Sequence, residues 1–326
     1  MAEKTFFFLI KQGSSPSLSL LEKLKTEDAL KQENVYLTSE KWIPNLISIL
    51  TSTYPTHHRM WTQTSEPGLH IDNVVSNLND NNSKCVLIGH DESIKVSRSI
   101  GIEPEHTSVA VNNEELFGHV KDAVNRDGEK EREFLFYIID DWCGQLTETI
   151  NSIVEREDDA PLTRLFITAI DSIGRKQNEM KKPVFWFSNE ENTEIPFDAA
   201  NELISILDLA PTILLHNGVP RPNNMLGKEI SWLFNDEARK KESRTRKNIL
   251  LEFENGEKSL ITENFRFNAK LGMSKGEIYD LKKDPEENNN LWDNLDTNKI
   301  KRLLYLEFLT EQMHKEVTPM PRIAGA

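Results

Sequence analysis

The sequence predicts an α/β protein with a mixed, mainly parallel sheet between helices, followed by a small antiparallel sheet and a closing helix. Short apolar runs alternate with helical patterns over the first two thirds of the chain, which indicates parallel strands covered on both faces. Near residue 237 the pattern changes to short strands separated by turn residues, which favours an antiparallel sheet. We therefore divide the chain into an α/β domain, 1–237, and an antiparallel-sheet subdomain, 238–326, packed on it.

The elements of the first half begin with a buried strand over residues 5–10, an apolar run too short for the hydrophobic region of a signal peptide. A helix is expected from residues 14–16, and a short amphipathic helix over 44–50. Residues 83–90 predict another apolar strand. Between residues 114 and 154 lie two helical patterns, the second with six apolar positions on one face. These positions are Leu135, Ile139, Trp142, Leu146, Ile150 and Ile153.

The second half opens with two further buried strands, 164–171 and 183–188. A helix is expected over residues 199–218, with a break or kink at Pro211 and a C-cap at Gly218. An exposed, charged connection then leads to four short strands and a last helix. The strands are expected over residues 248–255, 258–264, 265–271 and 277–281, and the helix over about 296–315.

Charge and composition exclude several classes of protein. A net charge of −14 argues against nucleic acid or an anionic membrane as the main partner. No run approaches the roughly 20 apolar residues that span a bilayer, so membrane insertion is not expected. Cys85 and Cys143 stand alone within apolar segments, which favours buried free thiols over a disulfide or a metal site. These observations together predict a cytoplasmic protein.

Five segments, in this order, resemble the sulfatase family of the alkaline-phosphatase-like superfamily. They span residues 16 to about 292, so the resemblance covers nearly the whole chain. The segments are "SPSLSLLEKL" (15–24), "LTSEKWIPNLISILTSTYPTHHRM" (37–60), "IDDWCGQLTETI" (139–150), "ILDLAPTILLHNGVPRPNNMLGKEI" (206–230) and "GEIYDLKKDPEENNNL" (276–291). The last is the most specific, because it follows the family pattern E-L-Y-D-L-x-x-D-P-x-E-x-x-N-L closely.

The resemblance implies a hydrolytic site at the C-terminal ends of the strands. It implies a divalent cation held by Asp and Asn oxygens, a nucleophile at a helix N-terminus, and Lys, His and Arg side chains around the sulfate or phosphate. The first strand should end in two aspartates, but Lys11 and Gln12 stand there. A lysine about 4 Å from a dication costs roughly 8 kcal/mol at an effective dielectric near 20, so the usual metal is disfavoured.

The position of the nucleophile is also altered. When the segment is aligned on its proline, Trp42 falls on the Cys or Ser that sulfatases use, Asn45 on a serine and Leu46 on an arginine. A shift of one residue offers only Lys41 or Ile43. An indole can neither attack as a hydroxyl does nor become the hydrated aldehyde of sulfatases. The segment therefore resembles the family's helix but lacks the residues that carry the family's chemistry.

The second half of the metal site is reduced to one aspartate. The family usually reads S-D-H-G or S-D-N-G after a buried strand, whereas this chain has Asp171, then Ser172, and Gly174 displaced by one. His90 falls at about the position of a family lysine. Because an unpartnered buried carboxylate is costly, we expect the Lys11 ammonium within about 4 Å of Asp171.

Other polar side chains have simpler interpretations. His57 and His58 lie at the exit of the short helix and are expected at the surface. His90 lies at a strand end, where either a site residue or a hydrogen-bonded loop histidine is possible. Asp140 and Asp141 are expected on a solvated face.

The leading hypothesis is a sulfatase-like pseudoenzyme with a binding or regulatory role, in which Lys11, Gln12, Trp42, His90 and Asp171 form a vestigial site. No cofactor is expected, a protein partner is possible, and a small-molecule anion is not an expected ligand. One alternative is an active sulfate- or phosphate-ester hydrolase with a non-standard site, using His90 with Asp171 and calcium or magnesium. Another is a structural subunit of a hetero-complex.

Overall fold

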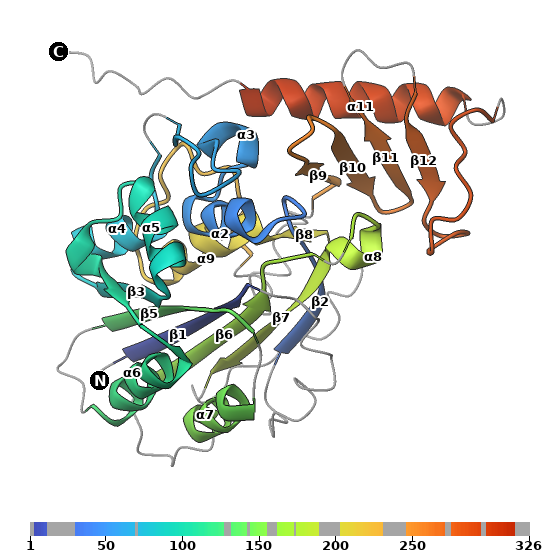
Figure 1. Ribbon diagram of the computed structural model, residues 1–326. Helices are drawn as coiled ribbons and strands as arrows, with labels where there is room; N and C mark the ends of the chain where they lie inside the picture. The colour runs from blue at the N-terminus through green and yellow to red at the C-terminus, as the bar shows by residue number, and fades with distance from the viewer. Residues whose placement is uncertain are drawn as a thin grey trace, which may run out of the picture.

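A mixed eight-stranded sheet runs through the larger part of the molecule in the computed structural model (Figure 1). The structure describes residues 3–11, 30–68, 71–126, 132–141, 144–154, 162–172, 174–188, 203–230, 246–270, 275–294 and 298–316. The sheet order is β4-β3-β5-β1-β6-β7-β2-β8. Its strands are β1 (Glu3–Ile10), β2 (Leu30–Tyr36), β3 (Lys84–Gly89), β4 (Thr107–Val109), β5 (Arg132–Ile139), β6 (Leu162–Ala169), β7 (Lys181–Ser188) and β8 (Ile204–Ser205). Only β7 runs antiparallel to its two neighbours, so the sheet is mainly parallel, as the alternating pattern predicts.

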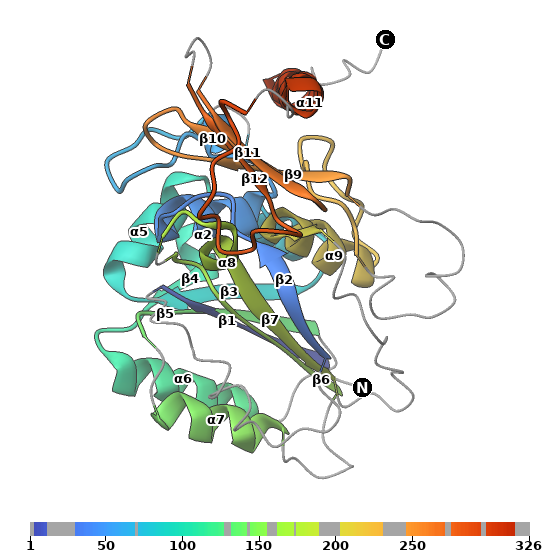
Figure 2. The ribbon, with the colours of Figure 1, turned by 90° about the vertical axis from the view of Figure 1, so that its right-hand side faces the viewer.

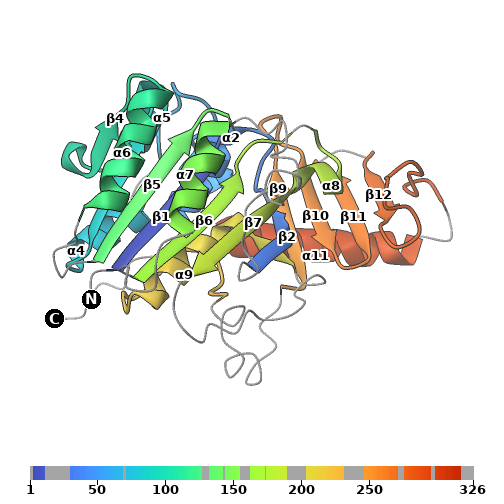
Figure 3. The same ribbon diagram turned by 90° about the horizontal axis from the view of Figure 1, so that it is seen from below.

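Helices cover both faces of this sheet (Figures 2 and 3). One face carries α2 (Trp42–Thr51), α4 (Val74–Asp80), α5 (Asp91–Ser99) and α9 (Leu209–His216). The other carries α6 (Asn113–Asn125) and α7 (Gly144–Val154). Short helices complete the domain: α3 (Pro55–His58), α8 (Gln177–Met180), η1 (Pro104–His106) and η2 (Ile206–Asp208).

Alternation along β1 divides the apolar core between the two faces. Phe7 and Leu9 pack in the cluster that contains α2, α4 and α9, whereas Phe6, Phe8 and Ile10 pack with α6 and α7. A strand that is buried on both sides has no polar face, which explains the continuous apolar run in its sequence.

A second, four-stranded antiparallel sheet forms the C-terminal part, in the order β12-β11-β10-β9. Its strands are β9 (Asn248–Glu252), β10 (Lys258–Thr262), β11 (Phe265–Ala269) and β12 (Glu277–Asp280), and α11 (Asn298–Glu316) lies across one face (Figure 1). Leu304 and Phe308 of that helix pack on Phe267, while Tyr54 and Leu207 join the same apolar cluster from the larger domain. The C-terminal sheet and α11 thus share an apolar core with residues of the larger part of the molecule.

Two expectations for the middle of the chain are wrong. Residues 135–139, expected as the start of a helix, are the end of β5, whose apolar residues 134–139 are buried on both faces of the sheet. The helix expected over 199–218 is α9 alone within the described residues, preceded by β8 and η2. Pro211 is the third residue of α9, where a proline needs no hydrogen-bond partner, so it causes no break. Gly218 has a φ of +68°, as expected just after the end of a helix.

Some expectations fall on residues outside the described ranges, namely the helix that follows residues 14–16, Gln12, and Trp142 with Cys143. Strand β2 was not expected from the sequence, because its LKQENVY segment is largely polar. None of the helices in the described ranges combines the length and the apolar character needed to cross a bilayer.

Candidate functional site

The parallel register brings several polar residues to one edge of the sheet. Ile10 at the end of β1 pairs with Ile139 of β5 on one side and with Ala169 of β6 on the other. Lys11 and Asp140 each follow directly after their strands, so they lie level with each other across the edge. Because the carboxyl ends of parallel strands meet at this edge, it is where the resemblance places a catalytic centre.

Lys11 is the centre of a compact ionic cluster. Its Nζ lies 2.9 Å from Asp140 Oδ1 and 3.2 Å from Glu92 Oε2. The Lys11 side chain is 9% exposed, whereas the two carboxylate side chains are 48% and 40% exposed. On a third side, Nζ lies 4.2 Å from the centroid of the Trp42 ring. The ammonium is therefore held between two carboxylates and an indole, with little contact with water.

The expected ion pair between Lys11 and Asp171 is wrong. Asp171 follows β6 by two residues, one residue beyond the level of Lys11, whereas Asp140 is level with it. In the part of the chain that the structure describes, Asp171 has no ion pair; its Oδ1 accepts a hydrogen bond from the backbone N–H of Ser172 (2.9 Å). Burial raises the pKa of Asp171, and the more distant Lys182 opposes this. Asp140, expected on a solvated face, takes the role we assigned to Asp171.

His90 caps this cluster on the side of β3, where it precedes α5. Its Nδ1 lies 3.2 Å from the carbonyl oxygen of Ala110, and its Nε2 lies 3.0 Å from Asn113 Oδ1. The same Nε2 lies 3.7 Å from Asp140 Oδ2. Within the described residues the carboxylate beside His90 is thus that of Asp140 and not of Asp171, so the geometry does not assemble the His90–Asp171 pair of the hydrolase alternative.

The start of α2 is fixed by one buried amide. Asn45 Oδ1 accepts hydrogen bonds from the N–H groups of Thr38 and Ser39 and from the Thr38 hydroxyl, all at 3.0 Å. Its Nδ2 donates to the carbonyl oxygens of Ser39 (2.8 Å) and Ile170 (2.9 Å). Asn45 therefore joins the loop before α2 to the end of β6, two of the segments that form the site.

His58 is fully buried, so the expectation of a surface histidine is wrong for this residue. Its Nδ1 accepts a hydrogen bond from the Met60 N–H (3.0 Å), and its Nε2 lies 3.2 Å from Ser48 Oγ of α2. Burial lowers the pKa of His58 to about 3. The neutral ring is a structural group beneath α2, where no ligand can reach it.

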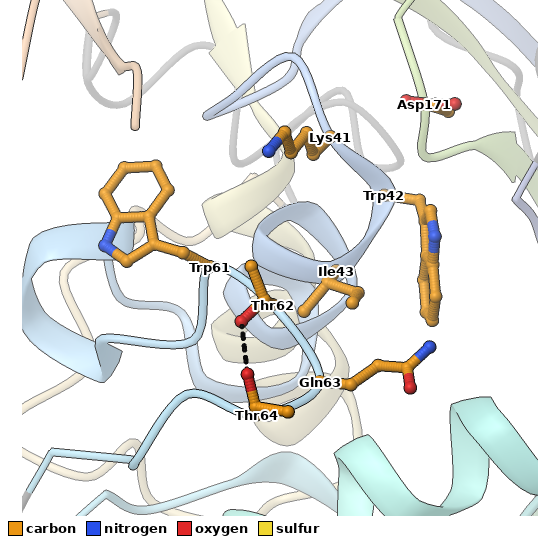
Figure 4. A pocket seen from close by; sticks show the side chains of 8 residues that line it. All are labelled: Lys41, Trp42, Ile43, Trp61, Thr62, Gln63, Thr64 and Asp171. Atoms are coloured by element: carbon orange, nitrogen blue, oxygen red, sulfur yellow. Dashed lines mark hydrogen bonds between the residues drawn. The ribbon is translucent and has the colours of Figure 1, made fainter. Parts of the chain in front are cut away.

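A pocket of about 410 Å³ opens at the start of α2 (Figure 4). It is lined by Lys41, Trp42, Ile43, Trp61, Thr62, Gln63, Thr64 and Asp171. The indoles of Trp42 and Trp61 lie on opposite sides of Ile43 and Thr62, and Asp171 lies above Trp42 in this view. The pocket thus combines two indoles, hydroxyl and amide groups, and a carboxylate.

Ion pairs connect the rim of this pocket to the turn between β9 and β10 of the C-terminal sheet. Lys41, which lines the pocket, forms an ion pair with Glu254 in that turn. Arg175, in the loop after Asp171, bridges Glu257 of the turn (3.1 Å) and Glu40 (3.2 Å). Two loops that flank the pocket are therefore fastened to the same turn.

A divalent cation does not fit the described residues at this edge. The carboxylates of Asp140 and Glu92 are both engaged by the Lys11 ammonium, and Asp171 is separate from them. Among the residues that the structure describes, no three His, Cys, Asp or Glu side chains are grouped so as to hold a metal ion. The donor set of the sulfatase resemblance is therefore not assembled by the described residues.

Sequence reasoning missed Glu92, Asp140 and Trp61 as members of this region. Asp140 would have been found if residues 132–139 had been recognised as a strand, because it is the first residue after them. Glu92 follows β3 and would have required the strand order β3-β5-β1. For Trp61, in the loop after α3, the sequence carries no signal that we recognise.

Comparison with known proteins supports the fold that the sequence predicts. Residues 191–315 match the family described as N-sulphoglucosamine sulphohydrolase, C-terminal. Curated proteins give no sequence match. A phosphonate monoester hydrolase from Silicibacter pomeroyi is 13% identical with a TM-score of 0.71, and the alignment covers 96% of each chain.

Two further solved structures are similar over nearly all of their length. A protein solved in complex with its substrate D-glucosamine-2-N,6-O-disulfate is 12% identical, with a TM-score of 0.71 over 98% of this chain and 99% of that one. A protein described as a 2-O GAG sulfatase is 14% identical, with a TM-score of 0.70 over 94% of this chain and 92% of that one. Similarity at this level of identity establishes the fold.

Proposed function

We propose that this chain, which has the fold of the sulfatases and the wider alkaline phosphatase superfamily, is a pseudoenzyme with a binding or regulatory role. The observation that carries the proposal is the Lys11 ammonium, held by Asp140 and Glu92 against the Trp42 ring. It stands at the end of β1, where the resemblance expects metal-binding aspartates.

The electrostatics of this cluster support a site that works without a divalent cation. An ammonium about 4 Å from a dication repels it by roughly 8 kcal/mol at an effective dielectric near 20. Asp140 and Glu92 already neutralise the ammonium, so they would have to leave it to bind a metal. We propose that Lys11 is the permanent internal cation of this site.

The groups around the pocket also support a non-hydrolytic role. Trp42, the first residue of α2, stands where the resemblance expects the nucleophile, and we propose that its ring fills the space of a substrate's sulfate group in active relatives. The hydroxyls of Thr62 and Thr64 lie 3.3 Å from each other and contact no histidine or carboxylate in the described chain. A hydroxyl without a base close to it is a weak nucleophile.

The test is an assay for hydrolysis with purified protein. Aryl sulfates, aryl phosphates and aryl phosphonates are incubated with calcium, magnesium or manganese, beside an active sulfatase as the positive control. We expect no turnover above the uncatalysed rate and no stabilisation of the protein by any of the three metals. Metal-dependent turnover that disappears in Asp171→Asn would overturn the proposal in favour of an active hydrolase.

A further inference from the structure

The pocket beside α2 has the size of a ligand site rather than of a packing defect. Its volume of about 410 Å³ lies within the range of roughly 300–1,000 Å³ that is typical of small-molecule sites. Trp42, Trp61 and Asp171 are each partly exposed, so a ligand can reach them from solvent. Figure 4 shows the two indoles on opposite sides of the floor formed by Ile43 and Thr62.

The charges around this pocket leave one negative group without a close ion pair among the described residues. Lys41, the cation in the lining, is paired with Glu254, and Lys11 beneath Trp42 is paired with two carboxylates. Asp171 has no ammonium or guanidinium within 4.0 Å in the described part of the chain. Among the described lining residues, an anionic ligand would therefore meet a carboxylate and no unpaired cation.

The aromatic rings of the pocket favour a cationic ligand. An indole face is electron-rich and attracts an ammonium within about 6 Å of its centroid, as Lys11 on Trp42 already demonstrates. Trp61 has no cation over its ring among the described residues. The pocket thus offers the Asp171 carboxylate to a cation, and the faces of Trp42 and Trp61 to the body of the ligand.

We propose that this pocket binds a small organic ammonium compound, with its charged nitrogen at Asp171 and its body between Trp42 and Trp61. Gln63, Thr62 and Thr64 offer hydrogen bonds to hydroxyl groups on that body. The inference rests on the proposed non-hydrolytic role and deepens it by naming the class of ligand. A site for sulfate or phosphate esters must bind an anion, whereas the proposed ligand of this pocket is a cation.

The experiment compares three sugars of similar shape and different charge. Dissociation constants are measured by titration calorimetry for glucosamine in its protonated form, for neutral glucose, and for anionic glucose 6-sulfate. We expect glucosamine to bind about fivefold tighter than glucose, the gain typical of one solvent-accessible charge pair, and glucose 6-sulfate to bind more weakly than glucose.

Three variants assign the effect to the pocket. Asp171→Asn keeps the shape and should remove the preference for glucosamine over glucose. Trp61→Ala should weaken both sugars by a similar factor, because it removes the aromatic wall. Glu105→Gln removes an exposed carboxylate that does not line the pocket and should change neither constant. Thermal unfolding of each variant checks that it is folded.

Several outcomes would overturn the inference. These are tighter binding of glucose 6-sulfate than of glucosamine, equal binding of all three sugars, binding of none, or a preference that survives in Asp171→Asn. Ester turnover in the hydrolysis assay would instead refute the proposed function. Absence of turnover together with absence of an ammonium preference would refute this inference alone.

Discussion

The Nζ of Lys11 lies 4.2 Å from the centroid of the Trp42 ring, so the end of β1 and the start of α2 are joined by a cation–π contact. Such contacts contribute about 0.5–2 kcal/mol, with the higher values where water is excluded, and the Lys11 side chain is 9% exposed. The same ammonium is paired with Asp140 and Glu92. A single group thus links the ends of β1 and β5 to the first turns of α2 and α5.

Replacing Lys11 by methionine should lower the free energy of unfolding by about 1–2 kcal/mol. Asp140 and Glu92 would then lie close together without a cation, but both are partly exposed, so the loss stays below the roughly 3–5 kcal/mol of a fully buried pair. Urea unfolding measures the change. Lys95→Met is the control, because its exposed pair with Asp91 should contribute less than about 0.5 kcal/mol. Equal effects of the two substitutions would contradict the buried role of Lys11.

Replacing Trp42 by serine should create no sulfatase activity. The hydroxyl would enter a site that still contains the Lys11 ammonium and that has Leu46 where the resemblance expects an arginine. Loss of the half-buried ring should also destabilise the protein by about 1–3 kcal/mol. Aryl sulfate hydrolysis, measured with and without calcium, checks the first expectation. Metal-dependent cleavage above that of the unchanged protein would show that the indole alone blocks catalysis.

Replacing Asn45 by alanine should destabilise the protein by about 3 kcal/mol. The substitution leaves buried N–H and C=O groups of Thr38, Ser39 and Ile170 without their partner, and each unsatisfied group costs about 1–3 kcal/mol unless water enters. Asn81→Ala is the matched control, since that exposed amide makes a side-chain bond only within its own helix end. A loss of less than about 1 kcal/mol in Asn45→Ala would mean that the loop before α2 is held by other contacts.

His58 should make the protein less stable as the pH falls below about 6.5. The folded protein keeps the ring neutral until about pH 3, whereas the unfolded chain takes up a proton near 6.5. Between these values the unfolded state binds more protons, so the stabilising contribution is complete above pH 6.5 and is lost on acidification. The slope approaches about 1.4 kcal/mol per pH unit for one proton.

The contribution of His58 is isolated by comparison with His58→Asn, whose amide oxygen can still accept the bond from Met60. Unfolding free energies of both proteins are measured from pH 7 down to pH 4. We expect the difference between the wild type and the variant to shrink steadily as the pH falls. A constant difference would show that the ring is protonated equally in the folded and unfolded states.

More of the fold than of the site could be predicted from the sequence. Apolar runs such as β1 and the turn-separated strands β9 to β12 carry their structure in local sequence. Strand β5 was misread because Leu135 and Ile139 continue the helical spacing of α7, and periodicity cannot distinguish a fully buried strand from a helix.

The contacts of the site depend on strand order, which no local pattern contains. The sequence identifies Lys11 and Trp42 as departures from the sulfatase resemblance. It does not reveal that β5 and β6 flank β1, or that Asp140 is level with Lys11 while Asp171 is one residue further on. The partner of Lys11 therefore could not be chosen before the register was known.

Ion pairs join the rim of the pocket to the β9–β10 turn, so the free energy of ligand binding and the free energy of local unfolding of the C-terminal sheet are coupled. Lys41 and Arg175 reach the turn from the two flanking loops, so opening of the turn breaks their ion pairs with Glu254 and Glu257. By thermodynamic linkage, a ligand that binds the pocket only while the turn is closed raises the free energy of opening the turn. Conversely, a partner that binds the sheet only while the turn is closed should raise the affinity of a pocket formed largely by residues 41–64. The C-terminal sheet is in this sense a second place from which the site can be controlled.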